Sequence, residues 1–288
     1  MTWQLFLTCF LILGTIVALL QRQLGKTIPQ YNRLVNGFFF IGVHYPLAII
    51  TALIIGFNAH ISWNNIIILF IVGISYPLTN ILAYRASKNV DAGLFGIINN
   101  LSPVITIALA GFLLAEDLTS QQFAGALIIV LSALSVSIVA YSRSSKSTRI
   151  GITLALLSVV LLGLDTVFES WMLKRIGMGS LLVYGLGFQT LWMAVFAWPQ
   201  RGQIGSIINR EYGPKVLTLS LAKSIKGIAF IAALYMSKSA AIVGAFTGFL
   251  PVMIVVSAYF FLKEKSHIKV KISAALAGLI GLVILSLG

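Results

Sequence analysis

Charge is scarce in this chain, and acidic residues are its rarest class. Only 9% of the 288 residues are charged, with 7 Asp and Glu against 20 Lys and Arg, whereas soluble domains average about 25% charged residues. A single cysteine, Cys9, excludes an intramolecular disulfide framework. The sequence also lacks a Gly-rich phosphate loop, a metal-ligand motif and a catalytic constellation. These absences argue against an enzyme and against ATP-driven chemistry, and they predict neither a cofactor nor a metal.

Apolar residues make up 59% of the chain, more than a soluble fold of this length can bury. Lipid is therefore the expected solvent, and the net charge of +13 does not indicate a nucleic-acid partner, because the basic residues are scattered over short loops. Crossing a bilayer takes about 20 mostly apolar residues, and ten runs of roughly that length are predicted as membrane helices. They cover approximately 3–20, 35–57, 65–85, 91–114, 121–141, 150–172, 180–199, 214–236, 239–262 and 268–287.

One stretch, 96–116, occurs twice at a fixed offset without a gap. The pairs that align include Gly96 with Gly244, Pro103 with Pro251 and Glu116 with Glu264. We therefore predict a duplication, with a first repeat over 1–143 and a second over 149–288. Each repeat holds five predicted helices, and two consecutive copies of an odd-numbered unit must enter the membrane in opposite directions. The predicted fold class is an all-α membrane protein with ten transmembrane helices in two inverted repeats, a common plan among secondary transporters.

The basic residues also predict an orientation. Loops after odd-numbered predicted helices hold 15 Lys and Arg, and loops on the opposite side hold 3. The positive-inside rule places the richer side in the cytoplasm, so both termini are expected outside the cytoplasmic membrane. The first four residues contain no Lys or Arg, so a cleaved signal peptide is not expected.

Two pairs of ionisable residues interrupt the apolar runs: Asp165 with Glu169 in the sixth predicted helix, and Lys223 with Lys226 in the eighth. Their spacings of four and three place each pair on one helix face. An ionisable group at membrane depth costs at least about 2.5–3.5 kcal/mol, so such groups mark a pathway or a pair. Three interpretations stay open: a structural ion pair of Asp165 with Lys226, a proton-binding carboxylate, since burial disfavours the charged form, and a lysine anchor for a substrate carboxylate or phosphate.

Uncharged polar residues also fall inside the predicted spans. Asn99 and Thr247 occupy the corresponding positions before Pro103 and Pro251, which indicates a shared central cavity, although hydrogen bonding between helices would equally explain them. His44 is interpreted either as a neutral structural histidine or as a proton carrier. The remaining candidates for the cavity wall are Tyr76, Asn80 and Gln189.

Two glutamates at helix ends and the small residues of the last predicted helix are interpreted as structural. Glu116 and Glu264, at the ends of the fourth and ninth predicted helices, are expected to anchor loops and not to bind substrate. The last predicted helix carries alanine and glycine at small-xxx-small spacing, which favours a peripheral or dimer-forming helix and a monomer or homodimer.

The passages Asn99–Pro103 with Leu113–Glu116, and Phe249–Pro251 with Phe261–Glu264, are each followed by a last helix rich in small residues. Over the whole chain this pattern resembles the paired EamA repeats of the drug/metabolite transporter superfamily. The resemblance implies a basket of helices in which the third, fourth, eighth and ninth line a central cavity and the fifth and tenth lie outside. It also implies transport of amino acids, nucleotide-sugars, sugar phosphates or other small polar metabolites.

The sequence departs from the family pattern at several places. Asp117 and Lys265 stand where an arginine usually follows the glutamate, and the loop charges favour outward termini, unlike many relatives. Lys223 with Lys226 is unusual on the eighth helix and favours an anionic or zwitterionic ligand.

The predicted function is secondary-active transport of a small polar metabolite, amino-acid-like or anionic or zwitterionic, by alternating access. The alternative is a non-transporting membrane scaffold or lipid-handling subunit. The predicted substrate-binding residues are Lys226, Lys223, Tyr76, Asn80, Asn99, Gln189 and Thr247. The predicted coupling residues are Asp165, Glu169 and His44.

Overall fold

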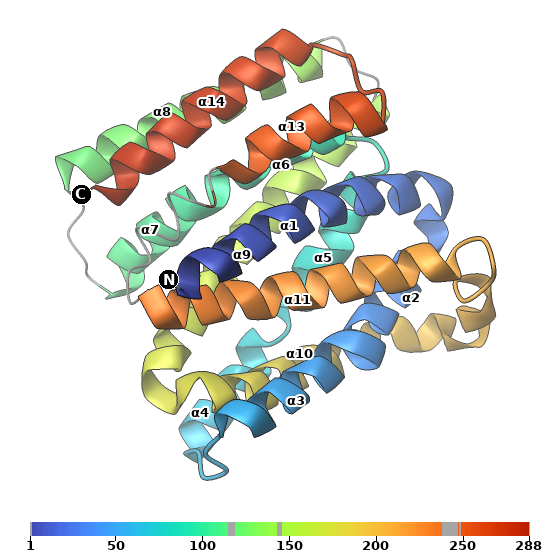
Figure 1. Ribbon diagram of the computed structural model, residues 1–288, viewed down its shortest axis with the longest axis vertical. Coiled ribbons are helices and arrows are strands. Elements are labelled where there is room, and N and C mark those ends of the chain that lie inside the picture. The colour runs from blue at the N-terminus through green and yellow to red at the C-terminus, as the bar shows by residue number, and fades with distance from the viewer. Residues whose placement is uncertain (1, 115–118, 143–145, 238–246, 248, 288) are drawn as a thin grey trace.

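The computed structural model describes residues 2–114, 119–142, 146–237, 247 and 249–287. The described part of the chain is built from helices, without a strand (Figure 1). The first-half α-helices are α1 (Thr2–Thr27), α2 (Asn32–Gly37), α3 (Tyr45–Ile55), α4 (Trp63–Val72), α5 (Ser75–Ala86), α6 (Ala92–Asn99), α7 (Leu101–Leu114) and α8 (Ser120–Ser142). The second-half α-helices are α9 (Lys146–Ser180), α10 (Leu186–Ala197), α11 (Gly213–Ser237), α13 (Phe249–Phe261) and α14 (Ile268–Ser286). Two 3₁₀ segments, η1 (Pro29–Tyr31) and η4 (Trp198–Ser206), and two π segments, η2 (Phe38–His44) and η3 (Leu181–Gly185), connect them.

Several of these helices are long and apolar enough to cross a membrane. Five such stretches are Trp3–Thr27, Pro29–Ile55, Trp63–Ala86, Lys146–Ser206 and Gly213–Ala233, and shorter apolar helices cover Ala92–Thr106, Ser120–Ser135 and Phe249–Phe261. The 61-residue stretch would be roughly 90 Å long as one helix, about three bilayer thicknesses, and it is interrupted at Gly177, where φ is 76°. The all-helical membrane class is confirmed, while the count of ten spans stays a prediction.

Prolines break two of the predicted spans. The span expected over 65–85 divides into α4 and α5 ahead of Pro77, and the span expected over 91–114 divides into α6 and α7 ahead of Pro103. Because proline has no N–H, the carbonyls of Gly73 and Asn99, four residues earlier, lose the donor that a continuous helix would supply. A Cβ on Gly73 would lie 2.7 Å from the Leu69 carbonyl oxygen and 3.1 Å from Phe188 Cβ of α10, so only glycine fits where this break approaches α10.

The helices pack in close pairs, with α1 on α11, α5 on α9, and α8 on α14 at one edge of the bundle (Figure 1). Small residues of α14 make its contact with α8 close: a Cβ on Gly281 would lie 2.8 Å from the Gly125 carbonyl oxygen. Gly278 faces Asn100 and Ser132 in the same way. The small residues thus serve packing within the chain, which agrees with a peripheral helix and accounts for them without a dimer.

A charged cluster joins four segments at one end of the bundle, and we call it the Arg22 network. The Arg22 side chain donates from Nε to Glu264 Oε1 (3.0 Å) and from Nη2 to Asp91 Oδ1 (3.3 Å). Lys271 Nζ donates to Asp91 Oδ2 (2.8 Å), and Glu264 Oε2 accepts the backbone N–H of Ala92 (2.9 Å) at the start of α6. Glu264 therefore anchors a helix end, as the sequence suggested.

Two expectations need adjustment at this network. The 15 Lys and Arg assigned above to loops include Arg22 and Lys271, but these two belong to α1 and α14 and are 6% and 4% exposed. The first helix continues to Thr27, well beyond the predicted end at residue 20, because a paired arginine can be buried where an unpaired one cannot. Glu116, the counterpart of Glu264 in the first repeat, lies outside the described residues.

Removing Arg22 should destabilise the protein strongly. Arg22→Ala leaves the buried Glu264 carboxylate without its cation, and losing one partner of a buried pair costs about 3 kcal/mol or more. Thermal unfolding of the purified protein in detergent measures this loss. Lys26→Ala, one turn further along α1 at an exposed position, is the matched control and should change stability by no more than about 0.5 kcal/mol. Equal unfolding midpoints for the two variants would contradict a structural role of the network.

Candidate functional site

The first group of buried polar residues surrounds Lys223 on α11. Its ammonium lies 4.6 Å from the centre of the Phe39 ring and donates a long hydrogen bond (3.4 Å) to Asn36 Oδ1. The Asn36 amide is oriented by its own donor, which reaches the carbonyl of Asn32 (2.8 Å) and that of Asn80 (3.4 Å). Lys223 is 8% exposed, so its partners among the described residues are an aromatic face and a neutral amide, with no carboxylate.

His44 belongs to the same group. It ends the π segment η2, directly ahead of Tyr45 and Pro46, where the missing proline N–H favours an irregular turn. Its ring stacks on Phe39 with centroids 4.8 Å apart, and its Nδ1 is buried with no hydrogen-bond partner in the described structure. A Cβ on Gly227, one turn beyond Lys223, would lie 3.5 Å from His44 Cε1, so the imidazole packs directly on α11.

Lys226 faces a different neighbour, although it lies one turn from Lys223. Its ammonium is 5.2 Å from the centre of the Phe10 ring on α1, and Phe10 in turn packs against Phe230 of α11. Lys226 is only half-buried. The two lysines therefore belong to one helix but to two aromatic environments.

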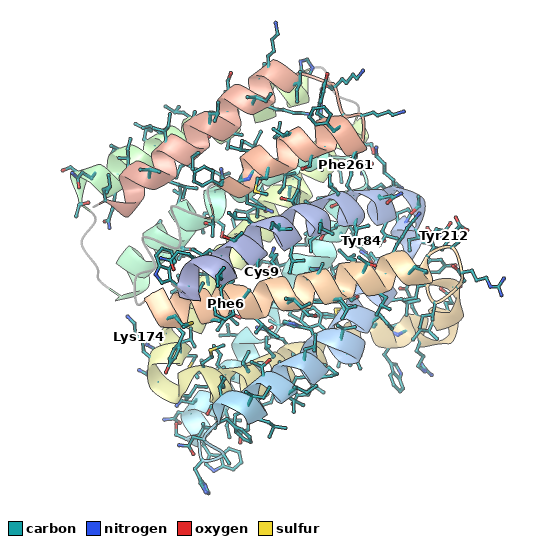
Figure 2. The ribbon with its side chains drawn as sticks, in the orientation of Figure 1. Phe6, Cys9, Tyr84, Lys174, Tyr212 and Phe261 are labelled. Carbon is teal, nitrogen blue, oxygen red and sulfur yellow. The ribbon has the colours of Figure 1, made fainter. Side chains whose placement is uncertain are left out.

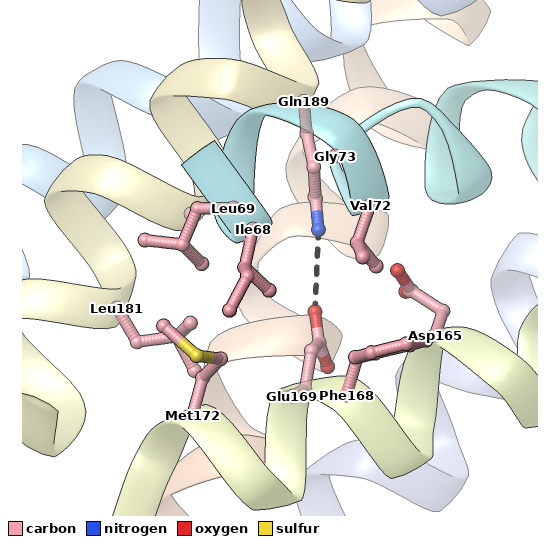
Figure 3. A pocket seen from close by; sticks show the side chains of 11 residues that line it. Ile68, Leu69, Val72, Gly73, Asp165, Phe168, Glu169, Met172, Leu181 and Gln189 are labelled. Atoms are coloured by element: carbon pink, nitrogen blue, oxygen red, sulfur yellow. Dashed lines mark hydrogen bonds between the residues drawn. The ribbon is translucent and has the colours of Figure 1, made fainter. Parts of the chain in front are cut away.

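The second group contains the carboxylates of α9 (Figure 3). Asp165 is 3% exposed, and its Oδ1 accepts a hydrogen bond from Ser75 Oγ (2.7 Å). Glu169, one turn along α9, accepts from Gln189 Nε2 of α10 (3.3 Å). Both carboxylates line a pocket between α4, α9 and α10, together with Ile68, Leu69, Val72, Gly73, Phe168, Met172, Leu181, Gly185 and Gln189. We call this the acidic pocket.

A structural ion pair between Asp165 and Lys226, one of the open interpretations, is wrong. The three ion pairs in the described part of the chain all belong to the Arg22 network. Helix α9 packs on α5 and α7, whereas α11 packs on α1 and η2, so the two side chains face different neighbours.

The start of α5 connects the two groups. Ser75 faces Asp165, while the ring of the next residue, Tyr76, packs edge-on against Phe40 with centroids 5.7 Å apart. Phe40 in turn meets His44 edge-on at 6.0 Å. Asn80, one turn later, bonds the Tyr76 carbonyl through its side chain and accepts from Asn36 through its own carbonyl.

The structure therefore brings together seven of the ten predicted site residues, in two groups. Lys223, His44, Tyr76 and Asn80 lie on the α11, η2 and α5 side, and Asp165, Glu169 and Gln189 lie in the acidic pocket. Lys226 lies apart from both groups, beside Phe10. Asn99 is half-buried at the end of α6 and makes no described hydrogen bond to either group. Thr247 is half-buried ahead of α13.

Sequence reasoning missed Asn36 and Ser75, which hold the charged side chains of the two groups. Asn36 is 2% exposed in an apolar segment, one turn from Asn32, and this spacing was the available signal. Ser75 carried no signal of its own, because a serine in a membrane helix usually bonds a carbonyl of the preceding turn, as Ser75 also does with Val72.

These features define a multi-pass membrane protein whose described helices bury charged residues of both signs. Figure 2 shows the described side chains on the ribbon. The model of the EamA-like transporter family matches the chain twice, over residues 1–138 and 149–287, and the chain belongs to that family. The resemblance inferred from the proline–glutamate passages is thereby confirmed. One solved crystal structure shares the fold with a TM-score of 0.67 at 18% identity, covering 99% of this chain and 96% of that chain. No curated protein matches the sequence.

The contact between Asn36 and Lys223 should appear as an energetic coupling. Asn36→Leu removes the oxygen that partners a buried ammonium, whereas in a Lys223→Met background that penalty disappears. We expect a coupling free energy of about 1 kcal/mol from the double-mutant cycle, measured by thermal unfolding. The same cycle with Lys226→Met is the control and should be additive, since Lys226 faces Phe10. Additivity in both cycles would contradict the Asn36–Lys223 bond.

Proposed function

We propose that this protein is a secondary-active transporter that moves a small polar metabolite across the cytoplasmic membrane by alternating access. One observation carries the proposal: Asp165 and Lys223 are buried among apolar helices, and among the described residues neither is paired with an opposite charge. An ionisable group without a counter-charge at membrane depth is expensive, and such groups are kept where a ligand or a coupled ion completes them. Membership of a transporter family supports the same conclusion.

The lysines favour a substrate with a negative group, either an anion or a zwitterion such as an amino acid. Lys223 is held by a neutral amide and an aromatic ring, which leave its charge uncompensated, and the partner of Lys226 among the described residues is the Phe10 ring. A carboxylate or phosphate would bind such ammonium groups with charge-assisted hydrogen bonds. The other residues proposed to contact the substrate are Tyr76, Asn80, Asn99, Gln189 and Thr247.

The carboxylates are proposed to couple transport to an ion gradient. Asp165 is the principal coupling residue, with Glu169 one turn away and His44 on the lysine side. Because Tyr76 packs beside Phe40 and follows Ser75 directly, a change in the charge of Asp165 reaches the lysine group through the start of α5.

The Arg22 network is proposed to close the cytoplasmic end. It ties α1, α14 and the segment after α13 to the start of α6, and the loops at this end carry most of the basic residues. By the positive-inside rule we propose that both termini lie outside. Opening toward the cytoplasm would require these bonds to separate. The two repeats, 1–143 and 149–288, would move against each other and so alternate between the two open states.

Replacing Lys226 should remove transport without removing the protein. Lys226→Ala takes away an attracting charge, and we expect flux to fall at least roughly tenfold, since losing one charge of a desolvated contact costs about 2–5 kcal/mol. The probe is chosen by thermal-shift screening of the wild type against amino acids and phosphorylated metabolites, and its flux is measured in proteoliposomes. Lys215→Ala, at the start of the same helix, is the matched control and should transport normally. Normal flux in Lys226→Ala would refute the role of this lysine.

Cysteine accessibility separates a transporter from a scaffold. In a Cys9→Ser background, single cysteines at Asn80, Asn99 and Lys226 should react with a small water-soluble thiol reagent, because a substrate pathway is wet. A scaffold or lipid-handling subunit predicts protection from both sides of the membrane at all three positions, and that result would favour the alternative.

A further inference from the structure

Several side-chain oxygen atoms of the acidic pocket accept no hydrogen bond in the described structure. The hydrogen bonds in the pocket engage one oxygen of Asp165 and one of Glu169, and they leave the second oxygen of each carboxylate. The Gln189 side chain is 4% exposed, and its Oε1 is buried with no hydrogen-bond partner. Gln189 extends from α10 toward Glu169 across the pocket (Figure 3). A buried amide oxygen without a donor is destabilising, so a hydrogen-bond donor or a cation is expected beside it.

The α4–α5 break adds two further features that attract positive charge. Gly73 lines the pocket, and Pro77 leaves its carbonyl without the donor that an uninterrupted helix would supply. The ten-residue helix α4 also ends beside the pocket, at Val72, and a helix C-terminus carries a partial negative charge. Interrupted membrane helices offer carbonyls and C-terminal ends of this kind to cations.

We propose that the acidic pocket is a binding site for a monovalent alkali cation, coordinated by Asp165, Glu169, Gln189 Oε1 and the Gly73 carbonyl. All four are oxygen ligands, which suit hard cations. No basic side chain lines the pocket to compete for the carboxylates. In the described residues, no group of three or more His, Cys, Asp or Glu side chains gathers, so the ligand set is short for a divalent or transition metal.

The proposal deepens the function given above, because the same carboxylates would then couple transport to a cation gradient. Binding itself does not depend on that function. A cation here would neutralise negative charge in the same interior where the lysines are proposed to bind an anionic group. Binding of the cation and binding of the anion would therefore favour each other.

Sodium is the probe for the test. The purified wild-type protein is titrated with NaCl, and choline chloride replaces it to hold ionic strength constant, so that screening does not change. We expect the unfolding midpoint to rise and saturate, by roughly 2–4 °C, as ligand binding stabilises the folded state. Direct binding of radioactive sodium to the same protein, competed by unlabelled sodium, is the second measurement and needs no variant.

Variants locate the site. Glu169→Gln and Gln189→Leu should abolish the sodium-specific rise, whereas Gln189→Glu, which keeps an oxygen at the same place, should retain it. Glu211→Gln, an exposed carboxylate far along the chain between η4 and α11, is the matched control and should behave as wild type.

Three results would overturn the proposal. The first is the absence of both sodium-specific stabilisation and bound sodium. The second is a midpoint that follows pH but not sodium, which would make the pocket a proton site only. The third is an equal sodium effect in the wild type and in both Glu169→Gln and Gln189→Leu, which would place the ion elsewhere. In each case Lys226-dependent flux could persist, so failure of the cation site and failure of the transporter assignment are distinguishable.

Discussion

Burying charge among apolar helices is the constraint on which this structure depends. Lipid and packed side chains offer no water, so every ionisable group inside the bundle must find a partner or be kept for a ligand. Arg22 meets this demand fully, with Glu264, Asp91 and the carbonyl of Ser87 around its guanidinium. Lys223 and the carboxylates of α9 do not, because their described partners are neutral. The contrast separates Arg22, whose charge holds helices together, from charges that we propose are completed by a substrate or a coupled ion.

Backbone carbonyls freed by proline are a second source of polar groups in the interior, besides the charged side chains. A proline in an apolar run opens the backbone four residues earlier, and the open carbonyl is polar without adding a charge. At Pro77 the opening falls on Gly73, whose missing side chain lets the break approach α10 and the acidic pocket. At Pro46 it falls within the π segment that carries His44. Both polar groups thus lie beside irregular backbone, which membrane proteins tolerate only where protein or a cavity covers it.

Much of the fold followed from local pattern. Apolar runs near the bilayer length predict helices, and a proline and a glutamate repeated at one offset predict a duplicated unit, because both signals depend only on residues close in sequence. The candidate residues Asp165, Glu169 and Lys223 were recognised for the same reason: a charge in an apolar run is visible without a structure. Asn36 and Ser75 were not recognised, since an asparagine or serine in a helix usually bonds its own backbone. The end of the first span was also misplaced, because Arg22 resembles a loop residue until its distant partners are known.

The sequence by itself determined that the protein is a helical membrane protein of two related halves with charges of both signs inside. Hydrophobicity and repetition are properties of the linear chain, and they do not depend on which helices become neighbours. Only the tertiary structure decided which charges meet. Asp165 and Lys226 both interrupt apolar helices, yet one faces Ser75 and the other faces Phe10, because the rotation of each helix is set by all the helices packed around it. Arg22 and Glu264 are separated by 242 residues and are nonetheless bonded, since the ends of α1 and α13 come together only in the assembled bundle.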